Sequence, residues 1–200
     1  MKQTTVAVVI TAIACLGVGF FFGFVSGIYT TELGKDFLEG MVAVEKPADI
    51  ESPKQVVRDQ FLFKYASNWE IDDQAEYFDM DSYFLIDTPG GSYIEFDITP
   101  GELSAKDQVR ETVEYFEQLF EVSKRIEFDR WGSYEGHGVH LYGNLFGEEV
   151  QTRTFCYATE NVTFTITEFF DTATIDMVSP GYDLIESSFE VLDAPEDMIE

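Results

Sequence analysis

An uncharged run at residues 4–29 constrains this chain more than any other feature of its sequence. About 20 consecutive apolar residues cross a bilayer as a helix, so the run is long enough to span one. The alternative is a cleaved signal peptide, whose apolar core measures only about 7–15 residues and ends at a small-residue cleavage site. Here apolar side chains continue through residues 20–25, beyond a lipoprotein-type site before Cys15. We therefore expect residues 1–30 to form an uncleaved, single-pass transmembrane helix in the lipid bilayer.

Three glycines recur every fourth residue within this run, at Gly19, Gly23 and Gly27. Residues four apart lie on one face of a helix, and small side chains there let two helix backbones approach closely in lipid. The alternative explanation is that glycine is common in membrane helices generally. Because the three glycines share one register, we expect this face to contact another helix, either in a larger membrane protein complex or in a homodimer.

The orientation of the anchor follows from the charges that flank it. Lys2 is the only basic side chain before the run, whereas Glu32, Lys35, Asp36 and Glu39 follow it. Positive charge favours the cytoplasmic side of a membrane. We therefore expect a cytoplasmic N-terminus and a main domain on the extracytoplasmic side, in a periplasm or a lumen.

The remainder of the chain is strongly acidic and rich in aromatic residues. The whole sequence has 12 basic and 38 acidic residues, a net charge of −26. Such a charge repels phosphate backbones and argues against nucleic acid as a partner. Solubility or a salty habitat explains the charge without a dedicated acidic site. The 19 Phe and 10 Tyr indicate an aromatic core and argue against disorder.

The two cysteines cannot form a disulfide within the domain, because Cys15 lies in the predicted span. Cys156 stands between Phe155 and Tyr157, which indicates a buried, inert thiol. A nucleophilic cysteine needs a positive neighbourhood that lowers its pKa.

The soluble part divides into a linker at residues 31–52, one α+β domain at residues 53–192 and an acidic tail at residues 193–200. Ser52 and Pro53 resemble a helix N-cap followed by a first-turn proline, so we expect a short helix at residues 53–59. Alternating Phe61, Phe63 and Tyr65 predict a strand. Residues 70–81 hold six carboxylates, too many to bury, and predict an exposed loop.

Turn residues at 88–91 predict a hairpin of strands 83–87 and 93–98. Its buried face would carry Ile94, Phe96 and Ile98, and its solvent face Tyr93, Glu95 and Asp97. Ser104 then caps a helix that runs to about Lys124, with an apolar stripe at Val109, Val113, Phe116, Leu119 and Phe120.

The rest of the domain reads as β structure. We expect strands at 126–134, 139–146, 150–159 and 162–169, a short helix within the ambiguous segment 171–187, and a closing strand at 188–192. This order of elements predicts an α+β fold with an antiparallel sheet flanked by helices.

Candidates for a chemical site are few. His137 and His140, beside Glu135, would point to opposite faces of a strand, and only a loop at residues 136–138 would join them at a metal. Asp79 and Asp81 lack the order of an EF-hand loop. The sequence has no phosphate-binding glycine loop and no Gly-x-Ser-x-Gly motif. We therefore expect no catalytic residue, no cofactor and no metal.

Several short segments resemble PsbP-like domains of the PsbP/Mog type. Residues 63–69 resemble the opening signature of that family, although Ala66 stands where the family has proline. Residues 136–143 and 153–159 are similar to its central hairpin, and residues 187–191 to its closing strand. The resemblance implies an α/β/α-like sandwich and a non-enzymatic accessory role, best known at the lumenal side of photosystem II. Because PsbP itself has no membrane anchor, the photosystem role is not implied for this chain.

Together these features predict a non-enzymatic, membrane-anchored accessory or assembly subunit of a larger membrane protein complex. A tethered sensor or carrier that binds a small ligand is the alternative. A tethered hydrolase with a carboxylate site is the least favoured class.

Overall fold

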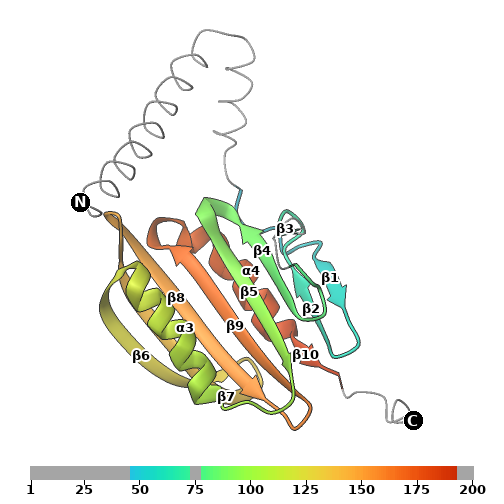
Figure 1. The fold of residues 1–200 in the computed structure, drawn as a ribbon. Coiled ribbons are helices and arrows are strands. Elements are labelled where there is room, and N and C mark those ends of the chain that lie inside the picture. Colours follow the sequence, from blue (N-terminus) through green and yellow to red (C-terminus); the bar gives the residue numbers. More distant parts are fainter. Residues whose placement is uncertain (1–45, 73–77, 193–200) are drawn as a thin grey trace, which may run out of the picture. The chain divides into compact units, whose positions relative to one another are not determined.

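The computed structural model describes residues 46–72 and 78–192 (Figure 1). The predicted membrane anchor with Gly19, Gly23 and Gly27, most of the linker and the acidic tail lie outside the described residues. Within these residues, no helix is long and apolar enough to cross a membrane.

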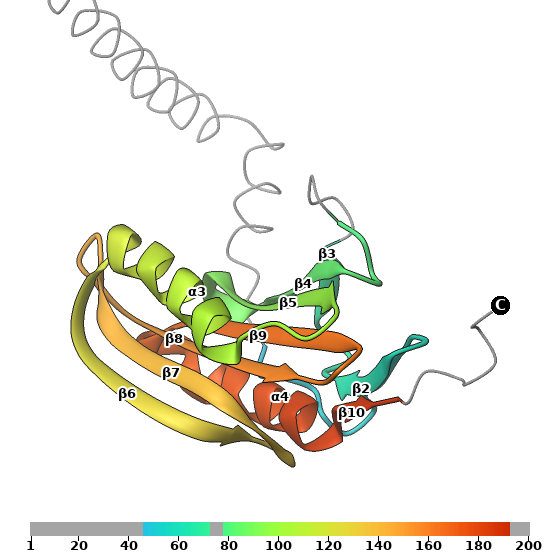
Figure 2. The same ribbon diagram turned by 60° about the horizontal axis from the view of Figure 1, so that its bottom comes forward.

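Within the same residues, seven antiparallel strands form one large sheet in the order β3-β4-β5-β9-β8-β7-β6. The strands are β3 (Glu70–Asp72), β4 (Tyr83–Thr88), β5 (Ser92–Pro100), β6 (Glu121–Trp131), β7 (Tyr134–Leu145), β8 (Glu148–Ala158) and β9 (Val162–Asp171). Helix α3 (Ala105–Leu119) covers one face and helix α4 (Ile175–Ser188) the other (Figures 1 and 2). The predicted α+β class with an antiparallel sheet between helices is confirmed.

A small second sheet joins segments from both ends of the domain. It consists of β1 (Lys54–Val57), β2 (Phe61–Tyr65) and β10 (Glu190–Val191) in the order β1-β2-β10. The predicted strand at 61–65 is therefore confirmed. The closing strand, predicted at 188–192, is confirmed at Glu190–Val191 alone, because Ser188 still belongs to α4. The predicted helix at 53–59 is wrong, because Val56 pairs with Phe63 in an antiparallel ladder.

The predicted β4–β5 hairpin and its turn are confirmed, with strand ends one or two residues beyond the predicted bounds. A 3-10 turn, η1 (Pro89–Gly91), connects the strands, and Phe84 pairs with Phe96. Ile94 and Phe96 are fully buried on the α4 side, as predicted. The opposite face was expected to be solvated, but Glu95 and Asp97 lie in a cleft beneath α3. The predicted exposed loop at 70–81 is wrong in part, since β3 pairs there with β4.

Helix α3 is capped as the sequence predicts but ends earlier. The Ser104 side chain accepts a hydrogen bond from the Asp107 amide. Val109, Val113 and Phe116 of the predicted stripe are buried, whereas Leu119 is 46% exposed. The chain becomes extended at Phe120, so residues 121–124 belong to β6 and not to the predicted helix end.

The largest core lies on the α4 side and is aromatic. Phe84 and Phe96 stack with ring centroids 4.7 Å apart, and Phe63 of β2 stacks on Phe96 at 4.9 Å. Val178 and Ile185 of α4 are fully buried in the same core. Helix α4 and strand β2 therefore share the covering of one sheet face, and they leave the β6–β7–β8 end of that face partly open.

Candidate functional site

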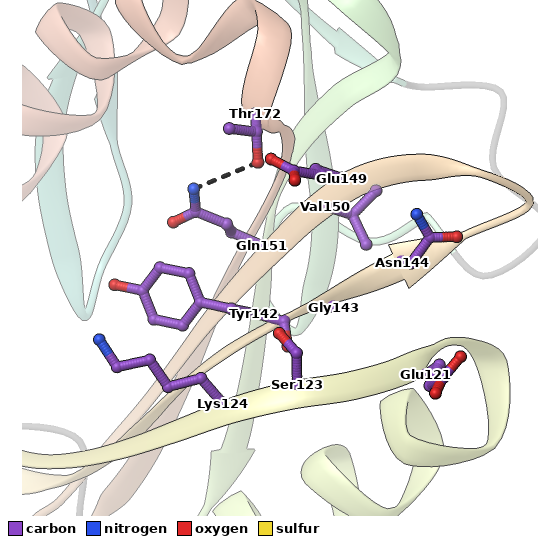
Figure 3. A pocket seen from close by; sticks show the side chains of 10 residues that line it. All are labelled: Glu121, Ser123, Lys124, Tyr142, Gly143, Asn144, Glu149, Val150, Gln151 and Thr172. Carbon is purple, nitrogen blue, oxygen red and sulfur yellow. Dashed lines mark hydrogen bonds between the residues drawn. The ribbon is translucent and has the colours of Figure 1, made fainter.

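A cavity of about 420 Å³ opens at the β6–β7–β8 end of the sheet, beside the 3-10 turn η2 (Thr172–Thr174) (Figure 3). Its centre is a row of three side chains on adjacent strands, because Lys124 pairs with Tyr142 and Tyr142 pairs with Gln151. The other lining residues are Glu121, Ser123, Gly143, Asn144, Glu149, Val150 and Thr172.

A hydrogen-bond chain orders the inner wall of this cavity. The amide nitrogen of Gln151 donates to Thr172 Oγ1 at 3.3 Å. Its oxygen lies 3.0 Å from His140 Nε2 and therefore accepts a hydrogen bond from it. His140 Nδ1 is then left to accept from the Tyr142 hydroxyl at 3.2 Å. Burial lowers the pKa of His140, which favours the neutral ring that this chain of bonds requires.

The cavity presents one cation and two carboxylates to solvent. Lys124 Nζ lies 5.0 Å from the centroid of the Tyr142 ring, and Glu121 and Glu149 lie at the rim. Ser123 Oγ donates to the backbone carbonyl of Tyr142, so this hydroxyl is not paired with a histidine base. Small-ligand sites usually measure about 300–1,000 Å³, and this cavity falls within that range. Its lining suits the binding of a small polar ligand better than acyl-transfer chemistry, which needs an activated nucleophile.

A buried ionic cluster lies in the next row of the same face. Glu168 of β9 is 2% exposed and pairs with Arg153 of β8, whose Nε lies 2.9 Å from Glu168 Oε2. Arg153 also pairs with Glu186 of α4. The Trp131 indole donates to Glu168 at 3.2 Å, and the Gly132 amide donates to Glu186 at 2.7 Å. These bonds fasten α4 to β8, to β9 and to the β6–β7 turn.

Opposing effects set the charges of this cluster. Burial raises the pKa of Glu168, although Arg153 opposes the shift. Burial by itself would lower the pKa of Arg153, but Glu168 and Glu186 outweigh it and raise that pKa. Every member has a partner, which is typical of a structural ion cluster.

A second, smaller cleft of about 270 Å³ lies between α3 and β5 and is acidic. Burial raises the pKa of Glu95 to about 7, the charge of Asp97 adds to the shift, and a hydrogen bond from Tyr83 opposes it. Glu111 of α3 lines the same cleft. Among the described residues, no group of three or more His, Cys, Asp or Glu side chains is placed to hold a metal ion.

The turn between β7 and β8 carries the most exposed apolar side chain in the described part of the chain. Phe146 is 100% exposed, and Tyr115 follows at 58%. Phe146 has φ = +54° and Gly147 has φ = +102°. The Gly147 amide donates to Asn144 Oδ1 at 2.8 Å, which fixes the turn. Since Asn144 and Glu149 also line the cavity of Figure 3, the two features share one end of the sheet.

The structure separates the residues that the sequence singled out. His137 and His140 lie three apart in β7 and therefore on opposite faces, as expected for a strand. Cys156 is fully buried, and burial raises the pKa of its thiol. The Asp79 carboxylate accepts hydrogen bonds from the Asp81 amide and the Ser82 hydroxyl within its own turn. The glycine face of the predicted anchor lies outside the described residues.

Sequence reasoning missed both the cavity and the hairpin tip. The sequence pattern puts Lys124 at the end of a helix, and Gln151 and Thr172 are far from Lys124 along the chain. The dipeptide Phe146-Gly147 was the one available signal, because it is a turn position with an apolar residue beside glycine.

No family model and no curated protein matches the chain. Three similar solved structures come from bacteria. A protein of Bacteroides thetaiotaomicron VPI-5482 has 14% identity and a TM-score of 0.45 over 70% of this chain, which spans 48% of that protein. Cyanobacterial PsbP (CyanoP) of Synechocystis sp. PCC 6803 has 16% identity and a TM-score of 0.45, over 72% of this chain and 94% of its own. LpqN of Mycobacterium tuberculosis, described as involved in cell envelope biogenesis, has 10% identity and a TM-score of 0.47. The match covers 74% of this chain and 91% of LpqN.

Proposed function

We propose that the protein is a non-enzymatic, membrane-anchored accessory or assembly subunit with a PsbP-like extracytoplasmic domain. It joins a larger membrane protein complex through its transmembrane helix and through this domain. The observation that carries the proposal is the full exposure of Phe146 at the tip of a hairpin. Most other phenylalanines of the described domain are buried in its core. Single exposed apolar residues are common on protein surfaces. The positive φ of this one adds a conformational cost that ordinary surface residues do not carry.

The predicted anchor supplies the second contact of the proposal. Gly19, Gly23 and Gly27 form the helix face that meets a partner helix in the bilayer, and the net charge of −26 disfavours nucleic acid as an alternative partner. The domain then works on the periplasmic or lumenal side.

Gentle detergent extraction of the tagged full chain tests this function. The wild-type protein should migrate as part of a larger complex. Gly23→Leu should release it from that complex while leaving it in the membrane fraction, because a bulky side chain separates the helices. Phe21→Leu, which keeps an apolar side chain off the glycine face, should change nothing. A wild-type protein that runs as a monomer with its anchor intact would refute the accessory role.

A second candidate function is a tethered sensor or carrier of a small polar ligand. The cavity favours it, because its inner wall is ordered by the chain from Tyr142 through His140 and Gln151 to Thr172. Native mass spectrometry of the gently extracted protein tests this function. A bound small molecule of constant mass would favour the carrier, and a protein free of ligand would disfavour it.

A further inference from the structure

The hairpin tip, residues 144–149, holds an aromatic residue in a backbone conformation that disfavours it. Phe146 is the only non-glycine residue with positive φ in the part of the chain that the structure describes. Positive φ at two successive residues is the pattern of a type I′ turn, in which Asn-Gly is preferred. A side chain with a Cβ atom crowds the backbone there, so phenylalanine opposes the turn that it occupies.

The Phe146 side chain has no internal packing that offsets this cost, because it is fully exposed. Asn144 holds the turn by accepting from the Gly147 amide, and this bond does not involve the phenyl ring. A residue that is both unfavourable for its turn and unburied in the isolated domain points to a contact outside the domain.

The surroundings of the tip define the charge of that contact. Glu148 and Glu149 come next after Gly147 in the chain and are exposed. Glu121, also exposed, lies opposite Asn144 in the β6–β7 ladder. The ring therefore projects from a negatively charged rim. Anionic lipid headgroups would be repelled by this rim, whereas a basic protein surface would be attracted to it.

We propose that Phe146 is a docking knob that inserts into an apolar pocket rimmed by Lys or Arg side chains on a protein subunit of the complex. This inference rests on the proposed accessory function and names the chemistry of its partner. A few side chains that fill well-packed pockets supply most of the affinity at protein interfaces. Complementary charges around them supply orientation and speed the association.

The first test separates a docking role from a structural one in the full-length protein. Phe146→Asn creates the preferred Asn-Gly turn and should raise the melting temperature by about 2–4 °C. The same variant should lose its place in the complex. Val57, elsewhere in the domain, is 54% exposed, and Val57→Thr serves as the control. It also removes an exposed apolar side chain, but it should leave complex formation unchanged. A Phe146→Asn variant that is less stable than wild type would show that the ring serves the fold and would overturn the inference.

The second test identifies what the knob touches. A photo-crosslinking amino acid at position 146 of the full chain, in native membranes, should attach to a protein segment that contains Lys or Arg. The yield should fall several-fold when salt is raised from about 0.05 to about 0.5 M, because salt screens exposed charges. The same label at Asn161, in the β8–β9 turn, should give little product. Attachment to lipid, or equal yields at both positions, would contradict the proposal.

Extraction of the same membranes distinguishes the two levels of the proposal. If the wild-type complex is recovered but position 146 yields no protein crosslink, the knob is wrong and the accessory role stands. If the wild-type protein is recovered only as a monomer, both are wrong.

Discussion

Arg153 shows how this acidic protein uses its few basic side chains. In the described part of the chain all five arginines form ion pairs, but Arg153 is the one that pairs with a fully buried carboxylate, that of Glu168. Its guanidinium also reaches Glu186 on α4. Removal of a buried cation leaves its carboxylate partner desolvated and unpaired, which is much costlier than the loss of an exposed pair.

Arg153→Met should therefore lower the free energy of unfolding by about 3–5 kcal/mol, measured by denaturant titration. Arg130→Met, which breaks an exposed pair with Glu135, should cost about 1 kcal/mol or less. Equal losses for the two variants would mean that water reaches Glu168 and that the cluster does not hold α4 to the sheet.

The junction between α3 and β6 shows how tertiary contacts decide the end of an element. The Phe120 ring is 5% exposed and lies directly over Gly143 of β7. A Cβ atom at position 143 would clash with this ring and would lie 2.5 Å from the Glu121 carbonyl oxygen. The close approach of Phe120 to a strand glycine thus ends the helix and begins β6, although residues 121–124 fit a helical pattern.

Gly143→Ala should push this junction apart and destabilise the domain by about 1–3 kcal/mol in the same titration. Ser123→Ala, on the neighbouring strand, removes only a hydrogen bond to the Tyr142 carbonyl and should cost about 1 kcal/mol. A neutral Gly143→Ala variant would show that the helix ends for a local reason instead.

The same distinction between local and distant causes explains which elements could be predicted from the sequence. The β4–β5 hairpin is encoded by side-chain alternation and turn residues within about 15 positions, so its two strands and the place of its turn are predictable to within one or two residues. The helix predicted at residues 53–59 is wrong, because Pro53 fits a helix start locally while Val56 pairs with Phe63 only in the folded chain. The odd spacing of His137 and His140 predicted opposite faces correctly. The cavity joins Lys124, Tyr142, Gln151 and Thr172 from four elements, and no local pattern reports such an assembly.

The acidic cleft beneath α3 makes the stability of the whole domain depend on pH. Burial raises the pKa of Glu95 to about 7 from an ordinary value of 4.5. Between these two values the folded state binds more protons than the unfolded state, so stability falls as the pH rises through this window. Burial also raises the pKa of Asp97, Asp87 and Glu168, and these shifts act in the same direction. Hydrogen bonds lower the pKa of Asp49, Asp79 and Asp107, so these groups change stability with pH in the opposite direction. Their carboxylates are fully exposed and contribute little.

The protein should therefore be more stable at pH 5 than at pH 8, with at most about 3 kcal/mol of the difference due to Glu95. Glu95→Gln keeps the shape of the side chain but never ionises in the cleft. It should raise the melting temperature at pH 8, leave it nearly unchanged at pH 5 and flatten the curve between them. Glu114→Gln, on the exposed side of α3, removes the same formal charge and should leave the slope as it is. If both variants shift the curve equally, the pH dependence comes from the overall negative charge, and the cleft has no special part in it.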